Sequence, residues 1–441
     1  MTASADHVAQ RHAEGTRRGR QAPLRRSGHC WGRLDDLVSG AAQIFPRFQE
    51  HILTHRSDEV VDVLQSVEDA TGSGHWAFGF ISYEAAVGLD PALPGVSTFA
   101  SGAGSALPLV WFGIAPPPLQ STELVARRAA YRTGPWTHQW TQAAYAKAFS
   151  RVKDTIAAGR SYQCNLTTTL TAPFAGDPTS LYADLAHAQR SRYCAYLEID
   201  SHVIASASPE LFFEWIGDTL RTKPMKGTAT RGRTLRRDQA LLRELLDSPK
   251  ERAENIMIVD LLRNDLAKIA RVGTVRVTAL LTPEEYPTVW QLTSEITAEP
   301  RPDTGLVAVM RAMFPCGSVT GAPKAETMHI IREIEGRRRG VYCGAIGWIA
   351  PAGEAVRARF SVAIRTAHID LLRGACEYGV GSGITWSSEA ASEFAELRAK
   401  RQILVNTGCA GQPGRAGQLL HGRIGGDADR PTTDAGVPGA H

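Results

Sequence analysis

Residues 219–232 read TLRTKPMKGTATRG, and their centre, Pro224-Met225-Lys226-Gly227-Thr228, holds a lysine between a proline and a glycine. Proline fixes φ and glycine lets another molecule approach the backbone closely, so Lys226 should lie on a constrained turn that a ligand can reach. On these residues alone an ordinary surface turn is the more frequent outcome. The rest of the chain decides between these two interpretations.

A β-hairpin is predicted immediately before this turn. The strand-like residues 211–215 and 219–222 are separated by Ile216-Gly217-Asp218, a short loop with the glycine that hairpins favour. Pairing of the two segments would bring Glu210 and Lys226 to the same end of a sheet. A carboxylate and an amine placed together can act as an acid/base and a nucleophile.

Composition indicates a globular protein with no large excess of charge. The 441 residues allow two or three average domains or one large one, and 43% are hydrophobic and 21% charged. The net charge of +4 arises within residues 1–30, where six arginines outnumber two acids, so no nucleic-acid partner is expected. Seven scattered cysteines without a CxxC argue against a disulfide scaffold and a zinc site, so we expect a cytoplasmic protein. No apolar run reaches 18 residues, so we expect no membrane contact.

The chain divides into four expected segments. Residues 1–30 form a basic tail and residues 406–441 a tail rich in Gly, Pro and Asp, and both are predicted to be disordered. Short apolar runs between turn residues indicate an N-terminal lobe over 31–135. Residues 140–405 alternate strands with amphipathic helices and carry the motifs that bear on chemistry.

Two predicted helices each carry carboxylates along one face. In residues 250–266, Glu251 and Glu254 lie one turn apart before an apolar stripe. Residues 388–404 contain a second set, spaced by four, three and four positions and therefore on one helical face: Glu389, Glu393, Glu396 and Lys400. Either set alone has an ordinary explanation, because acids favour the first turn of a helix and charged stripes favour solvent.

A glycine-rich loop precedes another predicted helix. Residues 314–324 read FPCGSVTGAPK, and residues 325–335 have helical character. The N–H groups and dipole at such a helix start favour an anion, although the spacing is not that of a P-loop. The structural alternative is a capping turn with Thr320 as N-cap. Strands are also predicted over 272–277, 288–297, 341–350 and 356–365.

Taken together, these segments resemble the chorismate-utilising enzyme family. The motifs that carry the resemblance are, in chain order, SPE (208–210), PMKGT (224–228), ENIMIVDLLRNDL (254–266), FPCGSVTGAPK (314–324), YCGAIGW (342–348), IRT (364–366) and GVGSGI (379–384), followed by the Glu-rich helix. The resemblance makes residues 140–405 the chorismate-binding catalytic region. It implies an α/β fold of the α+β type, with layered, mostly antiparallel sheets flanked by helices.

The resemblance also implies roles for motif residues. Lys226 would be the nucleophile and Glu210 the acid/base. Substrate contacts would come from Gly227, Thr228, Gln291, Ser318, Tyr342, Arg365, Gly381, Gly383 and Lys400. Among these, Arg365 and Tyr342 would bind the enolpyruvyl carboxylate of chorismate. Many relatives have histidine at the position of Gln291, and glutamine can donate a hydrogen bond but carries no proton at neutral pH.

A magnesium site is implied as well, because Mg²⁺ takes oxygen ligands from carboxylates, waters and substrate. Its ligands would be Glu254 and Glu396, with Glu251 and Glu393 in the same cluster, and the metal would hold the ring carboxylate.

Within the family, the residue before the Gly-Thr of the turn separates activities. Members that form anthranilate, isochorismate or salicylate usually have alanine, whereas members that form 4-amino-4-deoxychorismate have lysine. Lys226 therefore implies an enzyme that aminates chorismate for p-aminobenzoate and folate synthesis. The alternatives are another chorismate-utilising activity, such as anthranilate or isochorismate formation, and a non-catalytic subunit that would have lost residues of this set.

Ammonia would come from a separate glutamine amidotransferase subunit, because the chain carries no glutaminase cysteine motif, so a heterodimer is expected. Lys226 must be neutral to attack, which favours a nearby cation such as the metal or Arg231, whereas an ionised Glu210 would raise the lysine pKa. A protonated Glu210 would satisfy both roles.

Overall fold

The computed structural model describes residues 24–26, 30–94, 107–286 and 289–405. Of the predicted tails, only residues 24–26 and Cys30 lie within these ranges, and residues 24–26 form a short strand. None of the helices in the described ranges has the length and apolar character needed to cross a bilayer.

Two eleven-stranded sheets, antiparallel at every recorded pairing of their strands, form the centre of the molecule. The first contains, in spatial order, β1 (Leu24–Arg26), β4 (Glu50–Thr54), β6 (Val110–Ala115), β5 (Trp76–Ile81), β19 (Ala345–Ile349), β20 (Val356–Val362), β13 (Leu211–Ile216), β14 (Thr219–Lys223), β17 (Val289–Ala298) and β15 (Met225–Thr230), with β16 (Arg276–Glu285) also on β17. The second contains β18 (Gly321–Ala322), β10 (Gln163–Gly176), β22 (Ala375–Thr385), β21 (Thr366–Asp370), β12 (His202–Ser208), β11 (Tyr193–Ile199), β2 (Trp31–Asp36), β3 (Ala41–Phe45) and β7 (Leu119–Ser121), with β8 (Tyr131–Thr133) and β9 (Thr137–His138) on β10.

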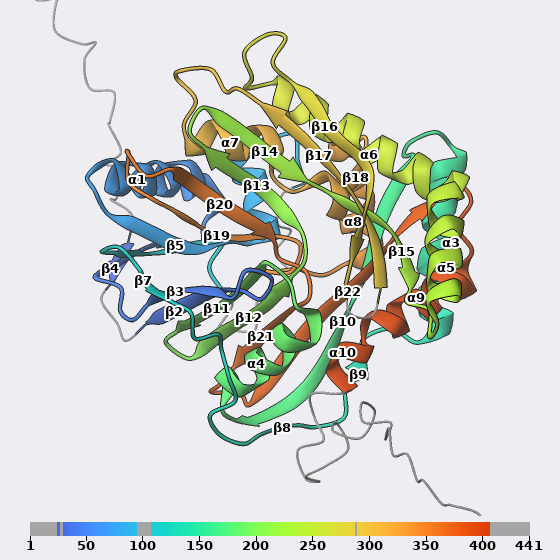
Figure 1. Ribbon diagram of the computed structural model, residues 1–441, viewed down its shortest axis with the longest axis horizontal. Coiled ribbons are helices and arrows are strands. Elements are labelled where there is room, and N and C mark those ends of the chain that lie inside the picture. Colours follow the sequence, from blue (N-terminus) through green and yellow to red (C-terminus); the bar gives the residue numbers. More distant parts are fainter. Residues whose placement is uncertain (1–23, 27–29, 95–106, 287–288, 406–441) are drawn as a thin grey trace, which may run out of the picture.

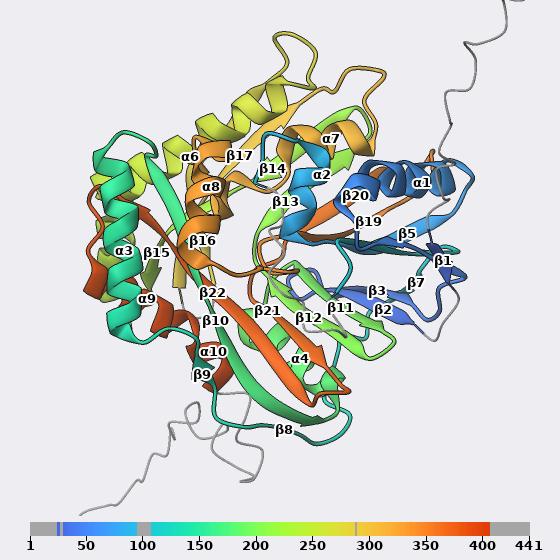
Figure 2. The same cartoon turned by 180° about the vertical axis from the view of Figure 1, so that it is seen from behind.

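Helices cover the outer faces of both sheets (Figures 1 and 2). They are α1 (Val60–Gly72), α2 (Ala86–Leu89), α3 (Gln142–Ala157), α4 (Pro178–Gln189), α5 (Leu235–Asp247), α6 (Pro249–Ala267), α7 (Leu306–Met313), α8 (Lys324–Glu335), α9 (Ala390–Lys400) and α10 (Gln402–Val405), with 3-10 turns η1 (Ser57–Glu59), η2 (Tyr83–Ala85) and η3 (Gly317–Val319).

Three hydrophobic clusters correspond to the interfaces between these layers. One packs α1, α6 and α7 on the first sheet. Another packs α3, α4, α8 and α9 on the second sheet. Between the sheets lies an aromatic cluster that includes Phe45, Phe78, Trp111 and Trp348. Burial of these apolar faces on both sides of each sheet holds the layers together.

The strands of residues 31–135 belong to both sheets and do not form a separate unit. β5 pairs with β19 in the first sheet, and β2 pairs with β11 in the second. The predicted N-terminal lobe is thus joined to the catalytic region by continuous sheet hydrogen bonding, which ties the two segments into one core.

Several predicted element boundaries differ from the structure. The strand expected over 272–277 begins only at Arg276 and runs to Glu285. Thr320 is not the N-cap of α8 that was predicted, because that helix begins after Pro323. The Thr320 hydroxyl instead donates to the carbonyls of Cys316 and Gly317. The expected last helix is divided into α9 and α10.

Candidate active site

The hairpin predicted before the lysine turn is present and brings Glu210 to the turn. β13 and β14 pair antiparallel, with Trp215 opposite Leu220. Glu210 comes directly before β13, and β15 begins at Met225, whose N–H hydrogen-bonds the Glu210 carboxylate. Local pairing of this hairpin therefore explains why an acid and a lysine 16 positions apart share one site.

Lys226 extends from β15 of the first sheet toward β22 of the second. Its Nζ donates to the carbonyl of Ser318 at 3.3 Å. A Cβ added at Gly383 would lie 3.3 Å from the same Nζ, so the glycine leaves the space that the amine occupies. Residues 225–230, which include part of the predicted turn, form strand β15, and Gly227, at φ +86°, lies at the register shift of β15 against β17 between Met225 and Thr228. A Cβ at Gly227 would lie 3.2 Å from Glu251 Oε2. The name lysine turn is kept for residues 224–228.

Glu210 is buried, and burial raises the pKa of its carboxyl group to about 7. A hydrogen bond from the Ser318 side chain and the charges of Lys226 and Lys400 oppose that rise. Its Oε1 has no hydrogen-bond partner among the described residues. A carboxyl group with this pKa can give or take a proton near neutral pH, as the acid/base role requires.

A row of glycines on β22 forms the floor of the site. Gly379, Gly381 and Gly383 alternate along the strand and therefore share one face. A Cβ at Gly379 would overlap the ring of Tyr342, and one at Gly381 would lie 3.2 Å from its hydroxyl. Lys400 Nζ donates to the Gly381 carbonyl at 2.7 Å. The glycines thus allow Tyr342 and Lys226 to lie directly against the strand.

The remaining predicted substrate residues adjoin this floor and turn. The Thr228 hydroxyl donates to Gln291 Oε1 at 3.0 Å, and Gln291 Nε2 donates to the Gly227 carbonyl at 3.0 Å. Both ends of the glutamine amide therefore hold the lysine turn. Arg365, between β20 and β21, donates to the Lys400 carbonyl at 2.9 Å.

Four carboxylates on two helices form a carboxylate cluster, defined here as Glu251 and Glu254 of α6 with Glu393 and Glu396 of α9. Lys250 Nζ bridges the helices, at 3.8 Å from Glu254 Oε1 and 3.5 Å from Glu393 Oε1. Glu396 pairs with Lys400 at 2.7 Å. Burial, together with neighbouring carboxylates, raises the pKa values of Glu251 and Glu254.

Comparison with known proteins agrees with this geometry. Residues 118–406 match the model of the family described as chorismate binding enzyme. The chain belongs to this family. The match includes the lysine turn, the glycine floor and both acidic helices, so the family predicted from the motifs is confirmed.

Relatives in the chorismate binding enzyme family match this chain over part of their own length. Aminodeoxychorismate synthase of Streptomyces griseus is 39% identical over 310 residues, which cover 69% of this chain and 41% of the relative. Aminodeoxychorismate synthase component 1 of Klebsiella aerogenes is 36% identical over 264 residues, covering 60% and 57%. Anthranilate synthase component 1 of Haloarcula marismortui is 39% identical over 268 residues, covering 60% and 53%. The chain spans about half the length of these relatives.

Solved structures show a similar fold. Anthranilate synthase component I of Streptococcus pneumoniae superposes with a TM-score of 0.65 at 21% identity, covering 90% of this chain and 95% of that one. The predicted α/β fold of the α+β type, with layered, mostly antiparallel sheets, is confirmed.

The carboxylate cluster suits a hard cation such as Mg²⁺ in its chemistry. Glu254 Oε1 is buried and has no hydrogen-bond partner in the part of the chain that the structure describes. Burial is the largest cause of the raised pKa values of Glu251 and Glu254, and nearby carboxylates add to it, whereas Lys400 lowers the pKa of Glu396. Within the described ranges no three His, Cys, Asp or Glu side chains are already arranged to hold a metal, so the magnesium site stays a prediction.

Gln163 is a site residue that the sequence did not reveal. It is fully buried on β10, and neither Oε1 nor Nε2 has a hydrogen-bond partner among the described residues. Its Nε2 would lie 3.1 Å from a Cβ at Gly383, beside Lys226. An unsatisfied buried amide at this position is suited to a polar ligand. Gln163 lies on β10, which pairs with β22, and the first residues of these two strands are 212 positions apart in the chain. No local sequence pattern therefore identifies Gln163.

Arg231, suggested above as a cation near Lys226, is paired elsewhere. Its guanidinium donates to Asp238 at 2.7 Å and to Glu285 at 2.7 Å, and it lies 4.6 Å from the centre of the Trp290 ring. Its charge is largely neutralised by these two acids. The expectation that Arg231 would lower the pKa of Lys226 therefore has no support in its contacts.

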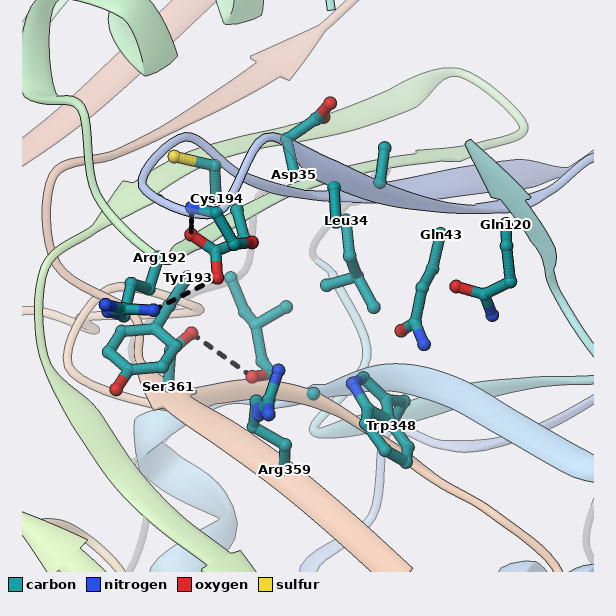
Figure 3. A pocket seen from close by; sticks show the side chains of 16 residues that line it. Leu34, Asp35, Gln43, Gln120, Arg192, Tyr193, Cys194, Trp348, Arg359 and Ser361 are labelled. Atoms are coloured by element: carbon teal, nitrogen blue, oxygen red, sulfur yellow. Dashed lines mark hydrogen bonds and ion pairs between the residues drawn. The ribbon is translucent and has the colours of Figure 1, made fainter. Parts of the chain in front are cut away.

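A separate cavity of about 270 Å³ lies between the two sheets (Figure 3). Gln43 and Gln120 line it from the second sheet, and Trp348 and Arg359 line it from the first. None of its lining residues belongs to the predicted catalytic, substrate or metal set. The chemistry is therefore assigned to the glycine floor and not to this cavity.

Proposed function

We propose that this chain converts chorismate and ammonia to 4-amino-4-deoxychorismate, the aminodeoxychorismate synthase reaction, for p-aminobenzoate and folate synthesis. The observation that carries the proposal is the position of Lys226. Its amine lies against Gly383 and hydrogen-bonds Ser318, whose side chain bonds the buried Glu210. A nucleophile and a general acid are thus placed in one site.

In the proposed reaction, neutral Lys226 Nζ forms a bond to ring C2 while the bond between C4 and its hydroxyl breaks. Protonated Glu210 donates the proton with which that hydroxyl leaves as water. Ammonia then bonds to C4, the bond between C2 and Nζ breaks, and the electron pair returns to the lysine. A proton from the added ammonia restores Glu210, which its pKa of about 7 permits.

Substrate binding in this proposal uses the glycine floor. The enolpyruvyl carboxylate is held by Arg365 and Tyr342, since a guanidinium and a phenol both donate to a carboxylate. Glu254 and Glu396, with Glu251 and Glu393, would hold Mg²⁺. When bound, this ion supplies positive charge that orients the ring carboxylate.

The ammonia source in this proposal is a separate glutamine amidotransferase subunit. Support comes from the component 1 names of several relatives, which imply a partner component. We place the enzyme in the cytoplasm, because the six described cysteines are buried free thiols of the kind found in a reducing compartment.

Product analysis tests the proposal. The chain is incubated with chorismate, Mg²⁺ and a high concentration of ammonium salt, with and without an added aminodeoxychorismate lyase. p-Aminobenzoate that forms only with the lyase is the expected result. Anthranilate or isochorismate as product would reject it.

Anthranilate formation is the second candidate, because an anthranilate synthase component 1 is as similar to this chain as the first-named relative, at 39% identity. Lys226 argues against it, since family members with that activity usually have alanine at this position. The same product analysis separates the two, because anthranilate forms without any lyase.

A further inference from the structure

A buried arginine joins two loops of the site that lie far apart in the sequence. Only 1% of the Arg339 side chain is exposed. Its Nε and Nη2 donate to the Glu335 carboxylate at 3.0 and 2.7 Å, and its guanidinium lies 4.6 Å from the centre of the Tyr83 ring. The charge is therefore balanced by a carboxylate and packed on an aromatic face.

Beyond this pairing, the guanidinium reaches two main-chain carbonyls. Nη1 donates to the carbonyl of Val319 at 2.8 Å, and Nη2 donates to that of Asn165 at 2.7 Å. The Val319 carbonyl also accepts from Asn165 Nδ2 at 3.1 Å. Two donors thus hold the Val319 carbonyl, one peptide unit beyond the Ser318 carbonyl.

Ser318 connects this peptide to the reacting groups. Its carbonyl accepts from Lys226 Nζ at 3.3 Å, and its side chain hydrogen-bonds Glu210. The Ser318 and Val319 carbonyls belong to consecutive planar peptide units of the buried turn η3, where Val319 N donates to the Cys316 carbonyl and Thr320 N to the Gly317 carbonyl, each at 3.2 Å. Because these bonds restrain rotation about the Val319 Cα, a shift of the Val319 carbonyl would be passed to the Ser318 carbonyl. The position of the lysine amine therefore depends on the peptide that Arg339 holds.

The backbone of Arg339 is fixed at its other end. Its N–H and that of Gly340 donate to the Glu84 carboxylate at 2.6 and 3.1 Å, and the Gly340 carbonyl accepts from Tyr83 N at 2.8 Å. Tyr342 lies two positions after Gly340 and packs on the glycine floor. One residue thus ties the Tyr342 loop to the Ser318 loop.

We infer that Arg339 is a positioning residue that sets the Lys226 amine, through the Val319 and Ser318 peptides, relative to Tyr342. Arginine suits this task because its planar fork can bond a carboxylate and two carbonyls at once, whereas a lysine offers a single charged centre. The role in turnover rests on the proposed function, but the effect on the amine does not.

The test compares Arg339→Lys with wild type and with Arg33→Lys in the full chain. Arg33 is a matched control, because it is buried, pairs with Asp35 and donates to the Glu123 carbonyl at 3.0 Å in the second sheet. Two quantities are measured: kcat and KM for chorismate with ammonium, and the rate at which acetic anhydride labels Lys226, followed by peptide mass spectrometry.

For Arg339→Lys we expect faster labelling of Lys226, a KM close to wild type and a kcat lower by about 100-fold, which is the cost of displacing a reacting group by about 1 Å. Arg33→Lys should match wild type in labelling and kcat. If Arg339→Lys and Arg33→Lys behave alike in both measurements, the inference is overturned.

If Arg339→Lys does not fold, Asn165→Ala is the variant that tests the inference in its place. It removes the second donor to the Val319 carbonyl and leaves Arg339 paired with Glu335, so the same changes are expected at smaller size. Unchanged labelling and kcat in that variant would overturn the inference. If wild type does not aminate chorismate but labelling changes only in Arg339→Lys, the proposed function fails and the inference stands.

Discussion

Two charged clusters lie near the Lys226 site, the buried pair of Arg339 with Glu335 and the carboxylate cluster, in which Glu254 and Glu393 are buried and Glu396 is exposed. They differ in how completely their buried groups are paired. Burial alone would raise the pKa of Glu335, but the charge and hydrogen bonds of Arg339 lower it below its ordinary value. Burial raises the pKa of Glu254, and the neighbouring Glu251 adds to the rise. The charged form of Glu335 is therefore stabilised by its partner, whereas the charged form of Glu254 is destabilised by burial and by Glu251.

This difference indicates different work for the two clusters. A buried ion pair with all its hydrogen bonds made holds the backbone in one arrangement and is costly to break. Carboxylates gathered without enough positive charge destabilise the protein unless a cation binds them. The Arg339 pair is therefore expected to provide geometry, and the carboxylate cluster is expected to provide binding.

Removal of Lys226 gives the largest expected effect, because its amine is the proposed nucleophile. In Lys226→Ala, formation of 4-amino-4-deoxychorismate should fall by about a thousandfold or more, as for loss of other catalytic nucleophiles. Chorismate binding, followed by quenching of tryptophan fluorescence, should remain. Unchanged turnover would exclude a covalent role for the lysine.

The two clusters should respond in opposite ways to neutral substitutions. Glu335→Gln leaves Arg339 without its counter-charge and should lower the free energy of unfolding by about 3–5 kcal/mol. Glu254→Gln removes repulsion and should leave that free energy unchanged or higher. Urea denaturation without Mg²⁺ measures both, and an equal loss in the two variants would remove the distinction drawn here.

Magnesium should affect the melting temperatures of Glu335→Gln and Glu254→Gln differently. Binding to the folded state alone raises the melting temperature, so Mg²⁺ should stabilise wild type and Glu335→Gln but not Glu254→Gln. Chelation by EDTA should reverse the shift and stop turnover. A shift of the same size in Glu254→Gln would place the ion elsewhere.

Glu210 should make both stability and activity depend on pH. Its folded pKa of about 7 lies above the ordinary 4.5, so the folded protein binds more protons between these values. Stability should therefore fall as pH rises through this window, by up to about 1.4 kcal/mol per pH unit. The general acid is also lost above about pH 7, so kcat should fall there.

Glu210→Gln is the variant that tests this assignment. It should reduce the slope in the unfolding free energy between pH 4.5 and 7, leaving the part due to Glu251 and Glu254, and lower kcat by about 100-fold, within the range for a general acid. If the variant keeps the wild-type slope, another group is responsible for it.

Gln291→His should have the smallest effect. The glutamine amide holds the lysine turn through Gly227 and Thr228, and histidine can keep one of these two bonds. The value of kcat/KM should change by less than about threefold, as for a substitution that alters one partly exposed contact. A larger loss would give Gln291 a role beyond support of the turn.

Local sequence patterns predicted the parts of the site that depend on neighbours in the chain. The hairpin from β13 to β14 has its loop and strands within a few residues, and α6 has both its two acids and its apolar stripe within one helix. These patterns were sufficient to place Glu210 beside the lysine turn and the two acids on one helix.

Long-range partners account for what the sequence could not supply. Arg339 acts on Val319 and Asn165, which are 20 and 174 positions away, and Gln163 faces a glycine on β22. The pairing of Arg231 with Asp238 and Glu285 likewise depends on how α5 packs on β15 and β16. No spacing in the chain encodes such contacts, because they arise only when the sheets assemble.

The most direct measurement is the intact mass of the protein after incubation with chorismate and Mg²⁺ in the absence of ammonia. The account predicts an added mass equal to chorismate less one water, located on Lys226 by peptide mapping and discharged by ammonium. Enzyme that aminates chorismate but shows no adduct under these conditions would contradict nucleophilic catalysis by Lys226.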